Sequence, residues 1–231
     1  MMTSMSTART SGRLAMLQLA SPLLPVGAYA YSQGLERAVH DGHVVDAPTA
    51  QRWILDLVSG PVAHFDAPVF VRLHGAALAR DAASFTRWNR RAIASRETRE
   101  LRAESLQMAA SLGTLARELR LGDAVALLDG LDRPAFPAAF AACAVALGVD
   151  VDDALTAYLY GWLENQVAAL LKVAPLGQAA GQRLLLEAHE PLASAIAIAM
   201  TLADDELASS APGLALSSAF HETQYSRLFR S

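Results

Sequence analysis

The sequence predicts an all-α protein, and three observations support this fold class. First, 53% of the 231 residues are apolar, and alanine and leucine account for most of them; both residues favour helices over strands. Second, apolar residues recur at helical spacing along most of the chain. Third, no long linker, low-complexity tract or internal repeat divides the sequence. We therefore expect one compact domain of about ten helices, which is long enough to bury a large core.

The chain begins with ten small, polar and unpatterned residues, MMTSMSTART. This composition predicts a disordered tail over residues 1–10. The helical domain is expected over residues 11–220. Its first helix starts near Leu14 and stops before Pro22, and a second ends near Gly42.

The next helix has clear start and stop signals. Asp46 is suited to cap it, Pro48 suits its first turn, and Gly60-Pro61 is expected to close it. Its apolar stripe consists of Trp53, Ile54, Leu57 and Val58. In the following helix, Phe70, Leu73 and Ala77 share one face.

The middle of the chain, residues 87–120, is its most charged part. Arginines alternate there with Glu97, Glu100 and Glu104. Such a run can bind nucleic acid or phosphate, but the interleaved glutamates favour a solvated helix face with internal pairs, such as Arg96 with Glu100.

Two later helices have distinctive patterns. One begins at Asp150 or Asp152, runs to about Val173, and places Tyr158 and Trp162 in the core at i, i+4 spacing. The stretch PLASAIAIAMTLA, residues 191–203, is apolar on nearly all sides and predicts a central, buried helix.

Composition excludes several classes of protein. The net charge is −4, which argues against a general nucleic-acid binder. The single cysteine, Cys143, rules out a disulfide framework within the chain and is expected to be a small core residue. The chain has no phosphate-binding loop, and its six histidines lack the clustered ligands that a metal site needs. We therefore expect no cofactor and no bound metal.

Targeting signals are weak. The apolar run from Pro134 to Val149 is shorter than the ~20 residues that span a membrane, and Pro137 and Gly148 interrupt it. Near the start, LAMLQLASPLLPV followed by AYA imitates a signal peptide, but polar residues and prolines break its apolar part. We expect a cytoplasmic protein with no membrane association.

The stretch SPLLPVGAYAYSQGLE, residues 21–36, is unlike the helical remainder. AYSQG is close to the G-x-S-x-G turn that exposes a catalytic serine, which would make Ser32 a nucleophile with His189 or His221 as its base. That turn requires a parallel sheet, which this sequence lacks. The alternative is a rigid turn that fixes Tyr29 and Tyr31, either as anchors for a partner or as core residues.

Three motifs, in order, resemble the UreF family of urease accessory proteins. They are LQLASPLLPVGAYAYSQGLE (17–36), LLKVAPLGQAAGQ (170–182) and HETQYSRLFRS (221–231), and the helix RAESLQMAASL is similar too. The resemblance places the apparent cleavage site inside a family motif. One departure is Lys172, where the family often has arginine.

The resemblance implies a non-enzymatic, all-helical and homodimeric assembly factor. Such a protein bridges a UreD- or UreH-type accessory protein and the GTPase UreG, and the complex delivers nickel to apo-urease. A helical scaffold for another GTPase or metalloenzyme is the alternative. The partner-binding residues implied are Tyr29, Ser32, Glu36, Lys172, Gln178, Gln182, His221, Arg227, Phe229 and Arg230.

The resemblance also implies roles for these positions. Tyr29 and Arg227 would help to dock the GTPase, with Glu36 and Lys172 on the same surface or, alternatively, buried as a pair. Gln178 and Gln182 would shape the loop after Pro175. The tail over residues 221–231 would order on binding the UreD-type partner.

Overall fold

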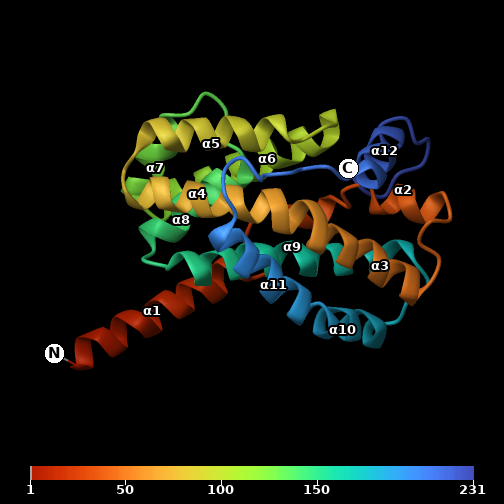
Figure 1. The fold of residues 1–231 in the computed structure, drawn as a ribbon, viewed down its shortest axis with the longest axis horizontal. Helices are drawn as coiled ribbons and strands as arrows, with labels where there is room; N and C mark the ends of the chain where they lie inside the picture. The colour runs from red at the N-terminus through yellow and green to blue at the C-terminus, as the bar shows by residue number, and fades with distance from the viewer. Residues whose placement is uncertain (1) are drawn as a thin grey trace. The chain divides into compact units, whose positions relative to one another are not determined.

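The computed structural model describes the backbone of residues 2–231 and the side chains of residues 10–231. This part of the chain contains α-helices, one 3₁₀-helix and one π-helix, and no strand (Figure 1). The all-α prediction is confirmed, with twelve α-helices instead of about ten. In chain order the elements are α1 (Met2–Ala20), η1 (Ala28–Ala30), α2 (Leu35–His40), α3 (Ala47–Leu57), η2 (Val58–Asp66), α4 (Ala67–Leu78), α5 (Ala82–Ala94), α6 (Arg99–Glu118), α7 (Gly122–Asp129), α8 (Phe136–Ala146), α9 (Val151–Val173), α10 (Gln178–Glu187), α11 (His189–Thr201) and α12 (Pro212–His221).

The expected disordered tail falls on residues 1–10. Met1 lies outside the described residues, and so do the side chains of residues 2–9. The expectation of a disordered tail therefore stays a prediction. The end of the first helix is confirmed, because α1 ends at Ala20, two residues before Pro22.

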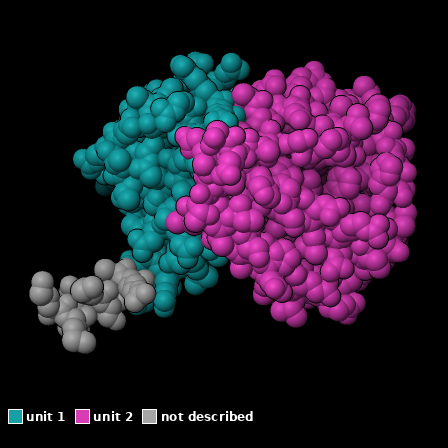
Figure 2. All heavy atoms as spheres, in the orientation of Figure 1, with its two compact units in different colours: residues 1–27, 69–93, 105–161 teal, residues 28–68, 94–104, 162–231 magenta. Residues whose placement is uncertain are grey.

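The contacts divide the chain into two compact units (Figure 2). Unit 1 comprises residues 1–27, 69–93 and 105–161, and unit 2 comprises residues 28–68, 94–104 and 162–231. Four of the five changes from one unit to the other fall inside helices, namely α4, α5, α6 and α9. Because no linker separates the units, the sequence shows no boundary and suggests a single domain.

The core of unit 1 is built around an aromatic cluster from α4, α8 and α9. The rings of Phe70 and Tyr158 stack with centroids 4.8 Å apart, and Phe140 meets both edge-on. The predicted face of α4 is confirmed, since Phe70, Leu73 and Ala77 are all buried. Cys143 also lies in this core, and burial raises the pKa of its thiol to about 12. A thiol of this kind is a packing residue and not a nucleophile.

Unit 2 contains α3, whose start is as predicted. The Asp46 side chain accepts a hydrogen bond from the backbone N–H of Thr49 at 3.0 Å, and Pro48 lies in the first turn. The predicted stop at Gly60-Pro61 is instead a kink, because the chain continues as η2 with Gly60 outside the helical region at φ −95° and ψ −108°. Pro61 lacks the backbone N–H that would donate the next helical hydrogen bond. This explains why the helix is kinked here and does not end.

The prediction of a central buried helix over residues 191–203 is wrong. Helix α11 packs against η2 and α10 along a narrow stripe of three residues, Leu192, Ala195 and Ala199. Ile196 and Ile198 are only partly covered, and Met200 is exposed. The apolar pattern could not distinguish a helix that is buried all round from one whose apolar surface is left for another contact.

Two stretches are long and apolar enough to cross a membrane by length and composition alone, Ala47–Leu78 and Gln178–Thr201. Their most apolar windows are 56% and 33% buried inside the protein. Core helices of soluble proteins share this composition, so the two stretches are weak evidence of membrane insertion.

Candidate functional site

The turn before α2 has an unusual backbone. Gln33 and Gly34 both have positive φ angles, 53° and 77°. A Cβ atom at Gly34 would lie 3.0 Å from the backbone nitrogen of Ser218 in α12, so glycine is required both for its conformation and for this close approach. Helices α2 and α12 pack together in unit 2 (Figure 1).

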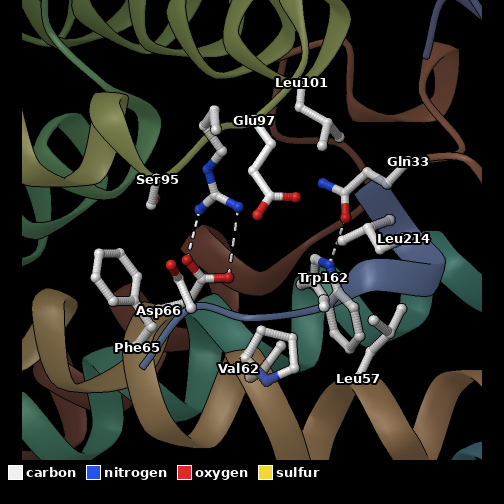
Figure 3. Close-up of a pocket in the computed structure, with 14 residues that line it drawn as sticks. Gln33, Leu57, Val62, Phe65, Asp66, Ser95, Glu97, Leu101, Trp162 and Leu214 are labelled. Carbon is white, nitrogen blue, oxygen red and sulfur yellow. Dashed lines mark hydrogen bonds and ion pairs between the residues drawn. The ribbon is translucent and has the colours of Figure 1, made fainter. Parts of the chain in front are cut away.

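Gln33 is a non-glycine residue in the left-handed region, and its side chain explains why it is held there. Its amide nitrogen donates to Glu104 at 2.6 Å. Its amide oxygen accepts from the Trp162 indole N–H at 2.8 Å (Figure 3). Gln166 donates to the same oxygen at 3.3 Å. A strained backbone that is held in place by several side chains is typical of a functional segment.

A small cavity of about 40 Å³ lies beside Gln33. It has room for water but is far smaller than the pockets that hold small-molecule substrates. At its rim the Arg96 guanidinium pairs with the Asp66 carboxylate at 2.6 Å (Figure 3). The predicted Arg96–Glu100 pair is therefore wrong: α6 starts at Arg99, so Arg96 precedes the helix and lacks i, i+4 geometry.

Three glutamates that are buried or nearly so hold the C-terminal segment, which we define as residues 221–231. Glu36, in α2, accepts hydrogen bonds from the backbone N–H groups of Leu228 at 2.7 Å and Phe229 at 3.0 Å. Its Oε2 also lies 3.2 Å from Nε2 of His221. The alternative of a buried Glu36–Lys172 pair is wrong, because Lys172 is exposed and its Nζ contacts the carbonyl oxygen of Tyr29.

The second glutamate, Glu100, lies in the first turn of α6. Its Oε2 is 2.6 Å from Nδ1 of His221, and its Oε1 accepts from the Arg227 guanidinium at 2.6 Å. Both ring nitrogens of the fully buried His221 thus face carboxylate oxygens. Both contacts are hydrogen bonds only when both ring nitrogens carry a proton, and the Arg227 guanidinium is the permanent cation that pairs with Glu100.

The third glutamate, Glu104, accepts from Gln33 and from the Ser231 hydroxyl at 2.7 Å. Burial raises the pKa of this carboxyl above its ordinary value of 4.5. Ser231 is also held by Ser32, whose N–H and Oγ both donate to its carbonyl oxygen, at 2.8 and 2.5 Å. In addition, the Arg230 N–H donates to the Ala30 carbonyl at 2.9 Å.

These contacts bear on the hydrolase alternative. Ser32 is fully buried, and its hydroxyl proton is directed at the Ser231 carbonyl oxygen. His221 is occupied by Glu36 and Glu100, and His189 is exposed at the start of α11. Among the described residues, Ser32 makes no hydrogen bond to a histidine, which is the contact that activates a serine nucleophile.

The predicted site residues separate into two groups. Ser32, Glu36, His221 and Phe229 are buried and hold the C-terminal segment to unit 2. Tyr29 is 73% exposed, whereas Tyr31 is 5% exposed, so one tyrosine is on the surface and the other in the core. The other surface residues are Lys172, Gln178, Gln182, Arg227 and Arg230.

Lys172 links Tyr29 to the C-terminal segment. Its ammonium lies over the rings of both Tyr29 and Phe229, at 6.0 and 5.3 Å from their centroids, within the range of cation–π attraction. Gln178 and Gln182 lie on the first two turns of α10, directly after the loop that follows Pro175, and their role in shaping that loop stays a prediction.

Sequence reasoning missed several residues of this site. Glu100 and Glu104 were interpreted as surface partners of arginines, yet they hold the C-terminal segment. Tyr225 is fully exposed, and Leu228 is 64% exposed. The sequence does give a sign that Tyr225 is exposed, because this aromatic residue stands among polar neighbours in HETQYSR. No sequence feature indicates that Leu228 is exposed while the adjacent Phe229 is buried.

Comparisons of the sequence with known proteins show the family of this chain. The family model described as UreF matches residues 44–189, well over half of the chain. The chain belongs to the UreF family. The urease accessory protein UreF of Janthinobacterium sp. (strain Marseille) is 50% identical over 220 residues, which cover 94% of this chain and 97% of that protein. The UreF proteins of Azoarcus sp. (strain BH72) and Nitrosospira multiformis are 49% and 46% identical, over 98% and 94% of this chain.

UreF membership identifies the chain as a urease accessory protein, a chaperone with a role in urease maturation. The region that the family model matches ends before the C-terminal segment and starts after α2. The matches to whole UreF proteins extend over nearly the full chain.

Proposed function

We propose that this chain bridges a UreD- or UreH-type accessory protein and a UreG-type GTPase, and that the complex inserts nickel into apo-urease. UreF membership supports the role in urease maturation. The bridging role is supported by one structural observation. The backbone of residues 228–231 is fixed by carboxylates and by Ser32, while Tyr29, Tyr225 and Leu228 remain exposed around it.

Exposed aromatic and leucine side chains on a fixed backbone suit a binding surface. Such residues act as anchors because little conformational entropy is lost when they are buried by a partner. Tyr29 and Arg227 dock the GTPase in this proposal, with Lys172 beside them. The UreD-type protein binds the C-terminal segment, including Arg230, and urease apoprotein joins the assembly.

The same protein forms a homodimer in this proposal and works in the cytoplasm. The partly covered isoleucines of α11 and the exposed Met200 support a homodimer, because a second copy would remove this apolar surface from water. Sedimentation velocity of the purified protein tests this, and a monomer at all concentrations would contradict it.

Co-expression with a urease operon tests the bridging role. A tagged form of the chain is expressed with the UreD-type protein, the GTPase and apo-urease, and the proteins that co-purify are identified. We expect one complex that contains both accessory proteins. If the GTPase co-purifies with the UreD-type protein equally well when this chain is omitted, the bridging role is wrong.

A further inference from the structure

Unit 1 contains a concentration of positive charge around one tryptophan. The guanidinium carbons of Arg72, Arg87 and Arg91 lie 5.2, 5.5 and 5.3 Å from the centroid of the Trp88 ring. Trp88 itself is 4% exposed. Each distance is within the range of cation–π attraction, so one buried indole from α5 organises three guanidinium groups from α4 and α5.

Among the described residues, two of these arginines lack a direct ion pair. Arg87 and Arg91 are exposed, and in the part of the chain that the structure describes neither forms an ion pair with a carboxylate. Arg90, between them, is also exposed and unpaired. The acidic group nearest to Arg87 in sequence is Asp81, which accepts hydrogen bonds from the Ser84 N–H and hydroxyl and feels Arg87 only as a weaker charge interaction.

Two of the three glutamates that the sequence places near this charge are used elsewhere, and the third, Glu97, is exposed and lines the small cavity of unit 2. Glu100 and Glu104 hold the C-terminal segment in unit 2. The arginines of α5 are therefore not an internally paired helix face. Like charges gathered at one place repel each other, and an anion bound there would relieve that repulsion.

We infer that Arg87 and Arg91, stacked on Trp88, form a docking surface for a carboxylate-rich segment of a partner protein. Guanidinium groups bind carboxylates through two parallel hydrogen bonds. Residues at i, i+4 on a helix are roughly 5–6 Å apart, a spacing that matches neighbouring acidic side chains. This surface goes beyond the bridging proposed above, which uses residues of unit 2.

Fluorescence anisotropy with a labelled decaglutamate peptide tests this inference on the full chain. We expect saturable binding that weakens as salt rises from about 50 mM to about 300 mM. Replacing both Arg87 and Arg91 by Ala should weaken it by at least about tenfold, and replacing both by Lys should weaken it less. The matched control replaces Arg52 and Arg183 by Ala. These are also exposed helical arginines, so net charge falls equally, and binding should stay within about twofold of the original.

Three results would overturn the inference. One is the absence of saturable peptide binding. Another is an equal loss of binding in the control variant, which would show attraction to net charge alone. The third is tighter binding of a short DNA duplex that depends on Arg87 and Arg91, which would assign the surface to nucleic acid. Circular dichroism confirms that each variant is folded, and the double Lys variant tests binding even if the double Ala variant unfolds.

Discussion

The imidazole of His221 lies 2.6 Å from the carboxylate of Glu100, with its Nδ1 atom facing Oε2. This contact joins the end of α12 to the first turn of α6, two positions 121 residues apart in the sequence. The other ring nitrogen faces Glu36. Within unit 2, the C-terminal segment is therefore held to α2 and α6 by the carboxylates of Glu36 and Glu100, and the surface proposed for partners depends on these contacts.

Replacing Glu100 by Gln removes the carboxylate that balances His221 and Arg227. Because Arg227 then loses its ion-pair partner, and the fully buried His221 ring faces an amide in place of a carboxylate, we expect the free energy of unfolding to fall by about 3 kcal/mol. Urea denaturation measures the change. Trypsin should also cleave the variant faster at Arg227 and Arg230. Glu118→Gln, an exposed change on the same helix, is the control. Equal stability of the two variants would show that the buried contact does not hold the segment.

Ser32→Ala removes a buried hydroxyl that donates to the Ser231 carbonyl oxygen. The expected loss is about 1–2 kcal/mol of unfolding free energy, since the hydroxyl also accepts a hydrogen bond from the Glu36 N–H at 3.3 Å and both bonds are lost, while the Ser32 N–H still satisfies the carbonyl. A serine-reactive fluorophosphonate should leave the original protein unlabelled. Labelling that disappears in the Ser32→Ala variant would instead support a nucleophilic serine.

The pH dependence of stability should carry a contribution from Glu104. Burial raises the pKa of this carboxyl above 4.5, so the folded protein retains a proton that the unfolded chain has released. Its contribution to stability is present below about pH 4.5 and is lost as the pH rises through the pKa of the folded state. Glu104→Gln keeps an acceptor for Gln33 and cannot ionise. The stability of the variant relative to the original protein should therefore increase between about pH 4.5 and pH 7. A constant difference across this range would contradict the account.

Leu228 offers a test of the partner surface with a matched control. Leu228 and Leu78 are 64% and 68% exposed, so replacing either by Ala should change folding stability by less than about 0.5 kcal/mol. Only Leu228→Ala should weaken co-purification of the accessory proteins, because Leu228 belongs to the C-terminal segment proposed to bind the UreD-type protein and Leu78, in α4, does not. Equal effects of the two substitutions would point to general loss of apolar surface.

Much of the fold could be predicted from the sequence where local chemistry decides it. Asp46 and Pro48 mark the start of α3, and Pro22 marks the limit of α1, because caps and prolines act over a single turn. The buried face of α4 follows from the spacing of Phe70, Leu73 and Ala77. The stretch over residues 21–36 also stands out in the sequence as unlike the helical remainder, and the structure requires a glycine at position 34.

The remaining features depend on contacts between distant residues. The sequence alone cannot tell whether the Glu100 carboxylate pairs with Arg96, four residues away, or contacts His221 near the end of the chain. Only the start of α6 at Arg99 decides between them. The apolar stretch in α11 likewise does not tell which of its faces is covered. The two units were missed because four of the five changes between them fall within helices.

The nickel content of urease tests the central claim most directly. Urease is purified from a urease-producing strain that lacks this gene and carries the original chain, the Tyr29→Ala variant or no copy, and its bound nickel is measured by mass spectrometry. We predict full nickel content with the original chain, a reduced content with the folded variant because Tyr29 is an exposed anchor, and very little without the gene. Fully loaded urease in the strain that lacks the gene would contradict the claim that this protein works by presenting binding surfaces to the urease maturation machinery.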